Sequence, residues 1–127
     1  MTDFNLVTSL GNPLPSPARD DPPSGRGFLR LGAVQCAWDP DPEAHIATLA
    51  SGVRLAAEQG ARVICLQELT LSPYFAYAQH DAQAAARYIE DIRSGPTATF
   101  ARSMAAETGA VIHASLYEQD PDGPGFN

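Results

Sequence analysis

Residues 31–68 read LGAVQCAWDPDPEAHIATLASGVRLAAEQGARVICLQE, and this stretch decides the fold. A short apolar run stands at each end, and between them apolar residues recur at steps of three and four. Such runs predict strands, and such a period predicts a helix. Asp41 and Pro42 indicate where that helix begins, and Gly60 indicates where it ends. Strand, helix and strand in this order form a βαβ unit, so the sequence predicts an α/β fold with a parallel sheet.

The chain beyond this unit continues the alternation of helix and strand. The continuous apolar run Val63–Leu66 predicts a strand that is buried on both faces of the sheet. Helices are predicted over 81–93 and 96–109, and a third strand over 110–117. Residues 120–125 are rich in Asp, Pro and Gly and lead to no further element. Because loops normally connect two elements, we expect the 127 residues to be a truncated chain.

Residues 1–27 differ in composition from everything that follows. Prolines, glycines and acidic residues are mixed there, and no periodic apolar face can form. We therefore expect a disordered tail over 1–27, with a partner-binding arm as the alternative, and a folded unit over 28–127.

The overall composition excludes several classes of partner. Fifteen acidic residues against eight basic ones give a net charge of −7, which argues against binding to nucleic acids or anionic membranes. No apolar stretch is long enough to cross a bilayer, and the first residues lack the features of a secretory signal. Two cysteines do not make a disulfide framework, so we expect a cytoplasmic protein. All eight basic residues are arginines, so a mechanism that needs lysine cannot find it in this chain.

Glu68 is the strongest candidate for chemistry. It follows the predicted strand Val63–Leu66, and ligands of open α/β sheets bind outside the carboxyl ends of the strands. Enclosed by Tyr74 and Phe75, this carboxylate could act as a general base. The alternative is a solvated or salt-bridged glutamate at a strand end, and Tyr74 and Phe75 could equally pack a buried loop.

The cysteines and histidines are weaker candidates for a functional site than Glu68. Cys65 lies in the middle of an apolar run and Cys36 near a strand end, so we interpret both as structural thiols in the core. The three histidines lack ligand spacing with Cys, Asp or Glu, so no metal site is expected. The sequence also contains no glycine-rich phosphate-binding motif and no GxSxG motif.

Several spaced segments resemble the carbon–nitrogen hydrolase (nitrilase) superfamily. They are LGAVQ at 31–35, GARVICLQEL at 60–69, SPYF at 72–75, GPT at 95–97 and ASLYE at 114–118. The sequences of the second and third segments are similar to those of the branch that contains β-ureidopropionase and N-carbamoylputrescine amidase. The resemblance covers residues 28–127 and leaves residues 1–27 unexplained.

The resemblance implies an α-β-β-α sandwich, of which this chain supplies roughly the first half, and a homo-oligomer when full length. It implies hydrolysis of a small linear amide or N-carbamoyl amine by Glu, Lys and Cys, with no metal and no cofactor. Glu68 matches the general base, and Glu118 matches a supporting acidic position. The lysine and the nucleophilic cysteine would lie beyond Asn127, so the isolated chain is expected to be inactive. The alternative is a non-catalytic α/β binding or interaction domain.

Overall fold

Parallel strands and two long helices make up the described part of the chain. The computed structural model describes residues 4–9, 29–74, 85–120 and 122–123. The elements are β1 (Leu31–Val34), α1 (Pro42–Glu58), β2 (Val63–Leu66), β3 (Ile89–Glu90), α3 (Pro96–Thr108), β4 (Val111–His113) and β5 (Tyr117–Glu118). Strands β1, β2 and β4 form one parallel sheet in that order, and β3 pairs in parallel with β5. The α/β class and the βαβ unit predicted from the sequence are confirmed.

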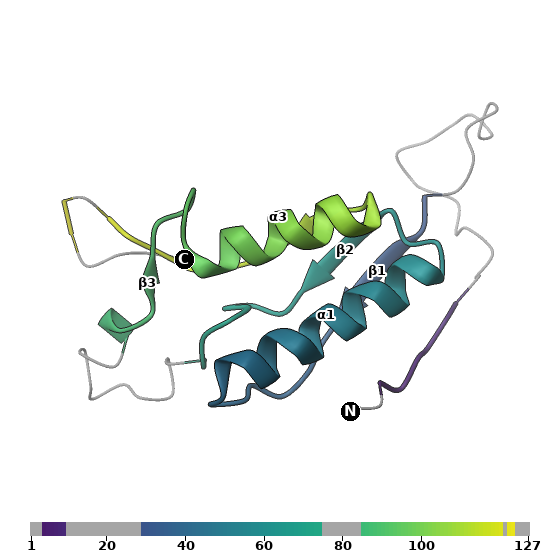
Figure 1. Ribbon diagram of the computed structural model, residues 1–127, viewed down its shortest axis with the longest axis horizontal. Coiled ribbons are helices and arrows are strands. Elements are labelled where there is room, and N and C mark those ends of the chain that lie inside the picture. Colours follow the sequence, from purple (N-terminus) through teal and green to yellow (C-terminus); the bar gives the residue numbers. More distant parts are fainter. Residues whose placement is uncertain (1–3, 10–28, 75–84, 121, 124–127) are drawn as a thin grey trace, which may run out of the picture.

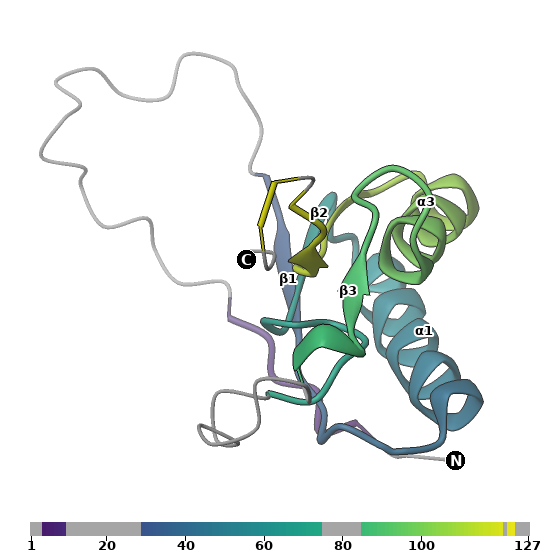
Figure 2. The ribbon, with the colours of Figure 1, turned by 90° about the vertical axis from the view of Figure 1, so that its left-hand side faces the viewer.

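Helices α1 and α3 cover the same face of the three-stranded sheet (Figures 1 and 2). This follows from the strand order, because successive right-handed crossovers in one direction place their helices on one side. The two helices also contact each other. Between them and the sheet lies a core of Val34, Leu49, Ala50, Val53, Ala61, Ile64, Leu66, Phe100, Met104 and Ala110.

Helix α1 begins and ends where the sequence predicts. The carboxylate of Asp41 accepts hydrogen bonds from the backbone N–H groups of Glu43 at 3.0 Å and Ala44 at 3.2 Å, which makes Asp41 the N-cap. After the helix, Gly60 adopts a φ of +86°, a left-handed conformation that glycine reaches without steric cost. The same device ends α3, where Gly109 has a φ of +67°.

One face of the sheet is open, which contradicts the expected burial of β2 on both faces. Ile64 and Leu66 point into the core, whereas Cys65 between them is exposed. Leu31 in β1 is 67% exposed and Val111 in β4 is 64% exposed. Helices α1 and α3 lie on the opposite face, so neither of them covers these side chains. The interpretation of Cys65 as a core thiol is therefore wrong for this chain.

The predicted third strand, 110–117, is divided into two. Strand β4 ends at His113, and the backbone N–H and carbonyl of Ser115 bind to Thr70 instead of continuing the ladder. The chain then enters β5, which pairs with β3 in the second sheet. A hydrogen-bonding partner from another loop thus ends the strand, and the apolar pattern of the segment could not indicate this.

The predicted helix 81–93 is wrong over its second part. Ile89 and Glu90 form β3, and the carboxylate of Asp91 then accepts hydrogen bonds from the N–H groups of Arg93 and Ser94. Such short-range bonds from an aspartate compete with the helical ladder. Residues 81–84 lie outside the described residues.

Residues 4–9 of the predicted tail lie beside β1 and α1 (Figure 1). Phe4 is half-buried against the core, and its ring comes close to Gly52 of α1. A β-carbon at position 52 would lie 2.8 Å from the Phe4 ring and 2.5 Å from Val34, so the glycine allows both side chains to approach. The remainder of the predicted tail lies outside the described residues.

Candidate functional site

Glu68 lies just past the carboxyl end of β2, which is the central strand of the three-stranded sheet. Because the three strands are parallel, their carboxyl ends meet at one edge of the sheet, where open α/β folds bind ligands. The Glu68 side chain is exposed in this chain. The carboxylate is therefore accessible at the edge of the sheet that the sequence predicted.

The residues on both sides of Glu68 are held in place. The side-chain oxygen of Gln67 accepts a hydrogen bond of 2.8 Å from the backbone N–H of Cys36, just beyond β1. The backbone N–H of Leu69 donates to Oγ of Ser115, which follows β4, at 3.2 Å. Leu69 has a φ of +53°, an uncommon conformation for a branched residue that surrounding contacts must maintain. Segments that follow three neighbouring strands thus fix the turn that carries Glu68.

Thr70 is the centre of the hydrogen bonds behind this turn. It is fully buried, its N–H donates to the Ser115 carbonyl at 2.9 Å, and its Oγ1 accepts from the Ser115 N–H at 3.1 Å. The Thr70 hydroxyl donates in turn to the Gln67 carbonyl at 3.1 Å. The buried ring of His45, in the first turns of α1, lies 2.9 Å from the Thr70 carbonyl through Nε2. Because a carbonyl only accepts, this nitrogen carries the proton.

The opposite ring nitrogen of His45 is a buried polar atom without a hydrogen-bond partner among the described residues. A cavity of about 260 Å³ lies beside this ring, lined by residues that include Leu71, Glu90 and Pro96. Inside it, Glu90 is already engaged, because its carboxylate accepts from the N–H and hydroxyl of Thr97 at 2.8 Å each. Glu90 thereby caps α3, whose own N-cap position, Gly95, has no side chain.

The other predicted site residues have different placements. Tyr74 is 47% exposed near the end of the turn, and Phe75 lies outside the described residues. Glu118 is half-buried in β5, in register with Glu90 of β3. Ser115 therefore connects the two candidate carboxylates along the chain, since it binds beside Glu68 and precedes Glu118 by three positions.

The two cysteines have contrasting surroundings. Burial raises the pKa of the Cys36 thiol, and a hydrogen bond with Gln67 opposes this in part. A raised pKa lowers the thiolate fraction, so Cys36 is poorly suited to act as a nucleophile. Cys65 lies on the open face of the sheet, in register with Ala33 and His113.

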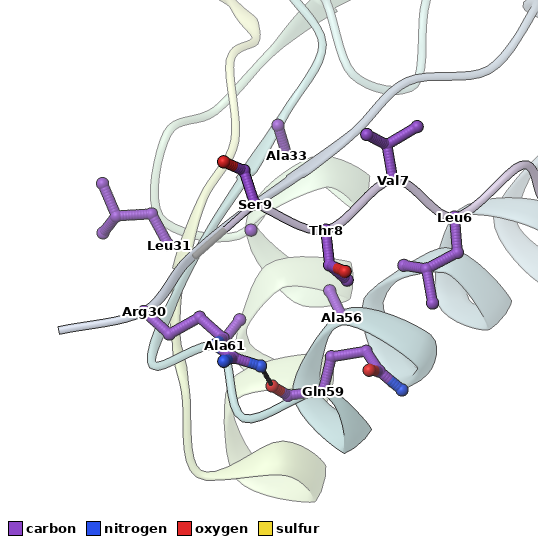
Figure 3. Close-up of a pocket in the computed structure, with 11 residues that line it drawn as sticks. Leu6, Val7, Thr8, Ser9, Arg30, Leu31, Ala33, Ala56, Gln59 and Ala61 are labelled. Carbon is purple, nitrogen blue, oxygen red and sulfur yellow. Dashed lines mark hydrogen bonds between the residues drawn. The ribbon is translucent and has the colours of Figure 1, made fainter. Parts of the chain in front are cut away.

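A small pocket of about 130 Å³ lies at the other end of the sheet (Figure 3). Residues 6–9 form one wall, and Arg30 and Gln59 close the end, where the guanidinium donates to the Gln59 carbonyl. Because this pocket adjoins the amino ends of β1 and β2, it is separate from the edge that carries Glu68. Among the described residues, no group of three or more His, Cys, Asp or Glu side chains could hold a metal ion. No described helix has the length and apolar character needed to cross a bilayer.

The residues missed by sequence reasoning are the ones that hold the turn. Gln67, Thr70 and Ser115 are ordinary polar residues, and only Glu68 among their neighbours suggests acid–base chemistry. One signal was present for Gln67, which directly follows the predicted strand Val63–Leu66 and so belongs at the carboxyl edge of the sheet, whereas Ser115 was placed inside the predicted strand 110–117.

Comparison of the sequence with known proteins identifies the family of this chain. Residues 30–127 match the carbon-nitrogen hydrolase family, and the chain belongs to this family. An N-carbamoylputrescine amidase from Solanum tuberosum is 33% identical over 94 residues, which are 72% of this chain and 30% of that protein. The N-carbamoylputrescine amidase from Solanum lycopersicum is 33% identical over 92 residues, with the same shares. The family resemblance found in the sequence is confirmed. The chain spans about 30% of the length of these curated relatives.

Proposed function

We propose that this chain is the N-terminal portion of an enzyme that hydrolyses the carbon–nitrogen bond of a small linear amide or N-carbamoyl amine. Membership of the carbon-nitrogen hydrolase family supports the reaction class. The names of the two relatives, both N-carbamoylputrescine amidases, support the N-carbamoyl amines as substrates.

The observation that carries this proposal is the fixed turn around Glu68 at the carboxyl edge of the sheet. In the proposed reaction Glu68 takes the proton of a cysteine thiol, and the sulfur attacks the carbonyl carbon of the substrate. Glu68 then gives this proton to the departing amine or ammonia, and afterwards takes a proton from the water that hydrolyses the thioester. A base that works in both half-reactions needs a constant position, and the turn provides one.

The nucleophilic cysteine and an oxyanion-stabilising lysine are proposed to come from residues after Asn127. The chain itself contains no lysine, and the raised pKa of the Cys36 thiol disfavours its thiolate. Glu118 is proposed as a supporting acid, and Tyr74 and Phe75 as parts of the substrate pocket. By itself the 127-residue chain is therefore expected to be inactive.

We also propose that a second sheet covers the open face and completes an α-β-β-α sandwich. The exposed apolar side chains of Leu31 and Val111 support this, because large uncovered apolar patches are rare on isolated domains. A cytoplasmic location and a homo-oligomeric assembly remain part of the proposal.

The test uses the polypeptide encoded by the complete reading frame. Release of ammonia from N-carbamoylputrescine and from simple amides is measured for the wild type, Glu68→Gln and the control Glu58→Gln, which alters an exposed glutamate of α1. Glu68→Gln should lower kcat by about 10²–10⁴-fold and leave the melting temperature unchanged, because an amide cannot accept the thiol proton. Glu58→Gln should match the wild type. A folded Glu68→Gln enzyme with normal kcat would remove Glu68 from the mechanism.

A non-catalytic α/β interaction domain is the second candidate. It is favoured by one observation, that the 127 residues include no lysine and so cannot supply the cationic group of the reaction. A stop codon directly after Asn127 would support this candidate. An open frame that continues into a lysine and then a cysteine would support the enzyme.

A further inference from the structure

We infer that Thr70 and Ser115 are positioning residues that hold the backbone on both sides of Glu68, and that His45 anchors them to helix α1. This inference rests on the proposed function of Glu68 as the general base. It deepens that function, since it names the groups that keep the base in place.

The backbone is restrained on both sides of Glu68. On its N-terminal side, the Gln67 carbonyl accepts from the hydroxyl of Thr70. On its C-terminal side, the N–H of Leu69 donates to Oγ of Ser115. The peptide groups that flank the carboxylate are thus each bound by one hydroxyl, and neither can rotate without breaking a hydrogen bond.

Thr70 and Ser115 are also bonded to each other. Thr70 and Ser115 exchange a pair of hydrogen bonds, from the Thr70 N–H to the Ser115 carbonyl and from the Ser115 N–H to Oγ1 of Thr70. This pair joins the turn after β2 to the segment after β4. Because Thr70 is fully buried and Ser115 is half-buried, loss of one of these bonds leaves a polar group of Thr70 unsatisfied in the interior.

His45 of helix α1 supports Thr70 from the interior of the protein. Nε2 of His45 donates to the Thr70 carbonyl at 2.9 Å, and both residues are almost completely buried. His45 belongs to the second turn of α1, whose start is fixed by the Asp41 cap. The turn is therefore connected to helix α1 as well as to the segments that follow β1 and β4.

The backbone at Leu69 has an uncommon conformation. The φ of +53° at Leu69 is unfavourable for a leucine, and such conformations persist only where their surroundings hold them. The bond from the Leu69 N–H to Ser115 restrains this residue directly, the Ser115–Thr70 pair restrains the next one, and the Leu69 carbonyl also accepts from the Ser72 N–H at 3.2 Å. Without them the turn should relax, and the Glu68 carboxylate should move with it.

The experiment compares substitutions of buried threonines in the polypeptide of the complete reading frame. Thr70→Val keeps the shape of the side chain but removes its hydroxyl, whereas Thr70→Ser keeps the hydroxyl. Thr97→Val is the matched control, because Thr97 is 1% exposed and also bonds through its hydroxyl, but to Glu90. Ser115→Ala is a second probe, which removes the acceptor of the Leu69 N–H and tests the inference even where Thr70→Val does not fold.

Thr70→Val should lower kcat by about 10- to 100-fold with little change in KM, because small displacements of a catalytic group have effects of this size. Ser115→Ala should lower kcat less, by about 5- to 10-fold, and Thr70→Ser should restore kcat to within about threefold of the wild type. Thr97→Val should lower the melting temperature without lowering kcat. The inference is overturned if folded Thr70→Val or Ser115→Ala keeps the wild-type kcat, or if Thr97→Val lowers kcat as much as they do.

A second readout separates this inference from the proposed function. Amide hydrogen exchange at Leu69 and Thr70 should be at least about tenfold faster in Thr70→Val than in the wild type, and unchanged in Thr97→Val. A wild type without hydrolytic activity would refute the proposed function, and exchange would then decide the positioning network alone. Unchanged exchange at both amides would refute the network, whatever the activity.

Discussion

Leu31→Ala in the polypeptide of the complete reading frame tests whether a second layer covers the open face of the sheet. Leu31 lies in β1 with 67% of its surface exposed in this chain. The substitution removes three carbons, each worth about 0.8 kcal/mol when fully buried, so full coverage makes its cost about 2.4 kcal/mol. An uncovered face leaves only the buried third of the side chain to lose, which is about 0.8 kcal/mol.

The assay is equilibrium unfolding in urea, followed by circular dichroism, for the wild type and two variants. Leu49→Ala is the control, because Leu49 is fully buried between α1 and the sheet and its truncation should cost about 2.7–5.0 kcal/mol. We predict that Leu31→Ala reaches about 2.4 kcal/mol, close to the lower end of that range. A cost at or below about 0.8 kcal/mol, with a normal result for Leu49→Ala, would refute the covered face and with it the sandwich.

Three further predictions concern single groups. In the 127-residue chain at pH 8, iodoacetamide should modify Cys65 faster than Cys36, because burial raises the pKa of the Cys36 thiol while Cys65 is exposed. Peptide mass mapping measures the two rates of modification, and equal rates would contradict this prediction. Asp41→Ala should lower the free energy of unfolding by about 1 kcal/mol, because the two hydrogen bonds of the N-cap are lost. Asp41→Asn should change it by only about a few tenths of a kcal/mol. Equal midpoints of urea unfolding for the two variants would argue against the cap. A hydrogen bond from Arg54 and the charge of Arg54 hold the pKa of Glu107 below its usual range. The stabilisation from this exposed pair is therefore complete above the pKa that the carboxyl has in the unfolded chain, and it is lost as the pH falls through the lowered pKa of the folded protein. Melting curves of the wild type and Glu107→Gln should therefore differ more at pH 7 than at pH 3, and a larger difference at pH 3 would reverse the sign of this reasoning.

The elements that the sequence predicted well are governed by local rules. Asp41, Pro42 and Gly60 fix the two ends of α1 through bonds and dihedral preferences that involve only near neighbours. Strand β2 and the position of Glu68 follow from an apolar run and from the chemistry of parallel sheets. For these, a single sequence is sufficient.

The elements that it missed depend on partners distant in the chain. Ile89 and Glu90 form a strand because β5 pairs with them, although their own pattern favours a helix. The strand after α3 is interrupted because the backbone of Ser115 forms hydrogen bonds with Thr70, which lies 45 positions earlier in the chain. The open face around Cys65 was missed for a related reason, since a continuous apolar run does not reveal whether the second covering layer lies within these residues. In the candidate site, the position of Glu68 at the carboxyl edge of the sheet was predicted from the sequence, whereas the bonds of the Thr70 and Ser115 hydroxyls to the neighbouring backbone were not.

The contact of Phe4 with the core affects where the domain can be cut for expression. The proline- and glycine-rich region from residue 10 onwards invites truncation at residue 28, but this would remove Phe4 together with it. The surface above Gly52 would then lose its cover, and the part of the core against which Phe4 packs would be more open to water. A variant for crystallisation should therefore retain residues 4–9, and an affinity tag belongs at the C-terminus.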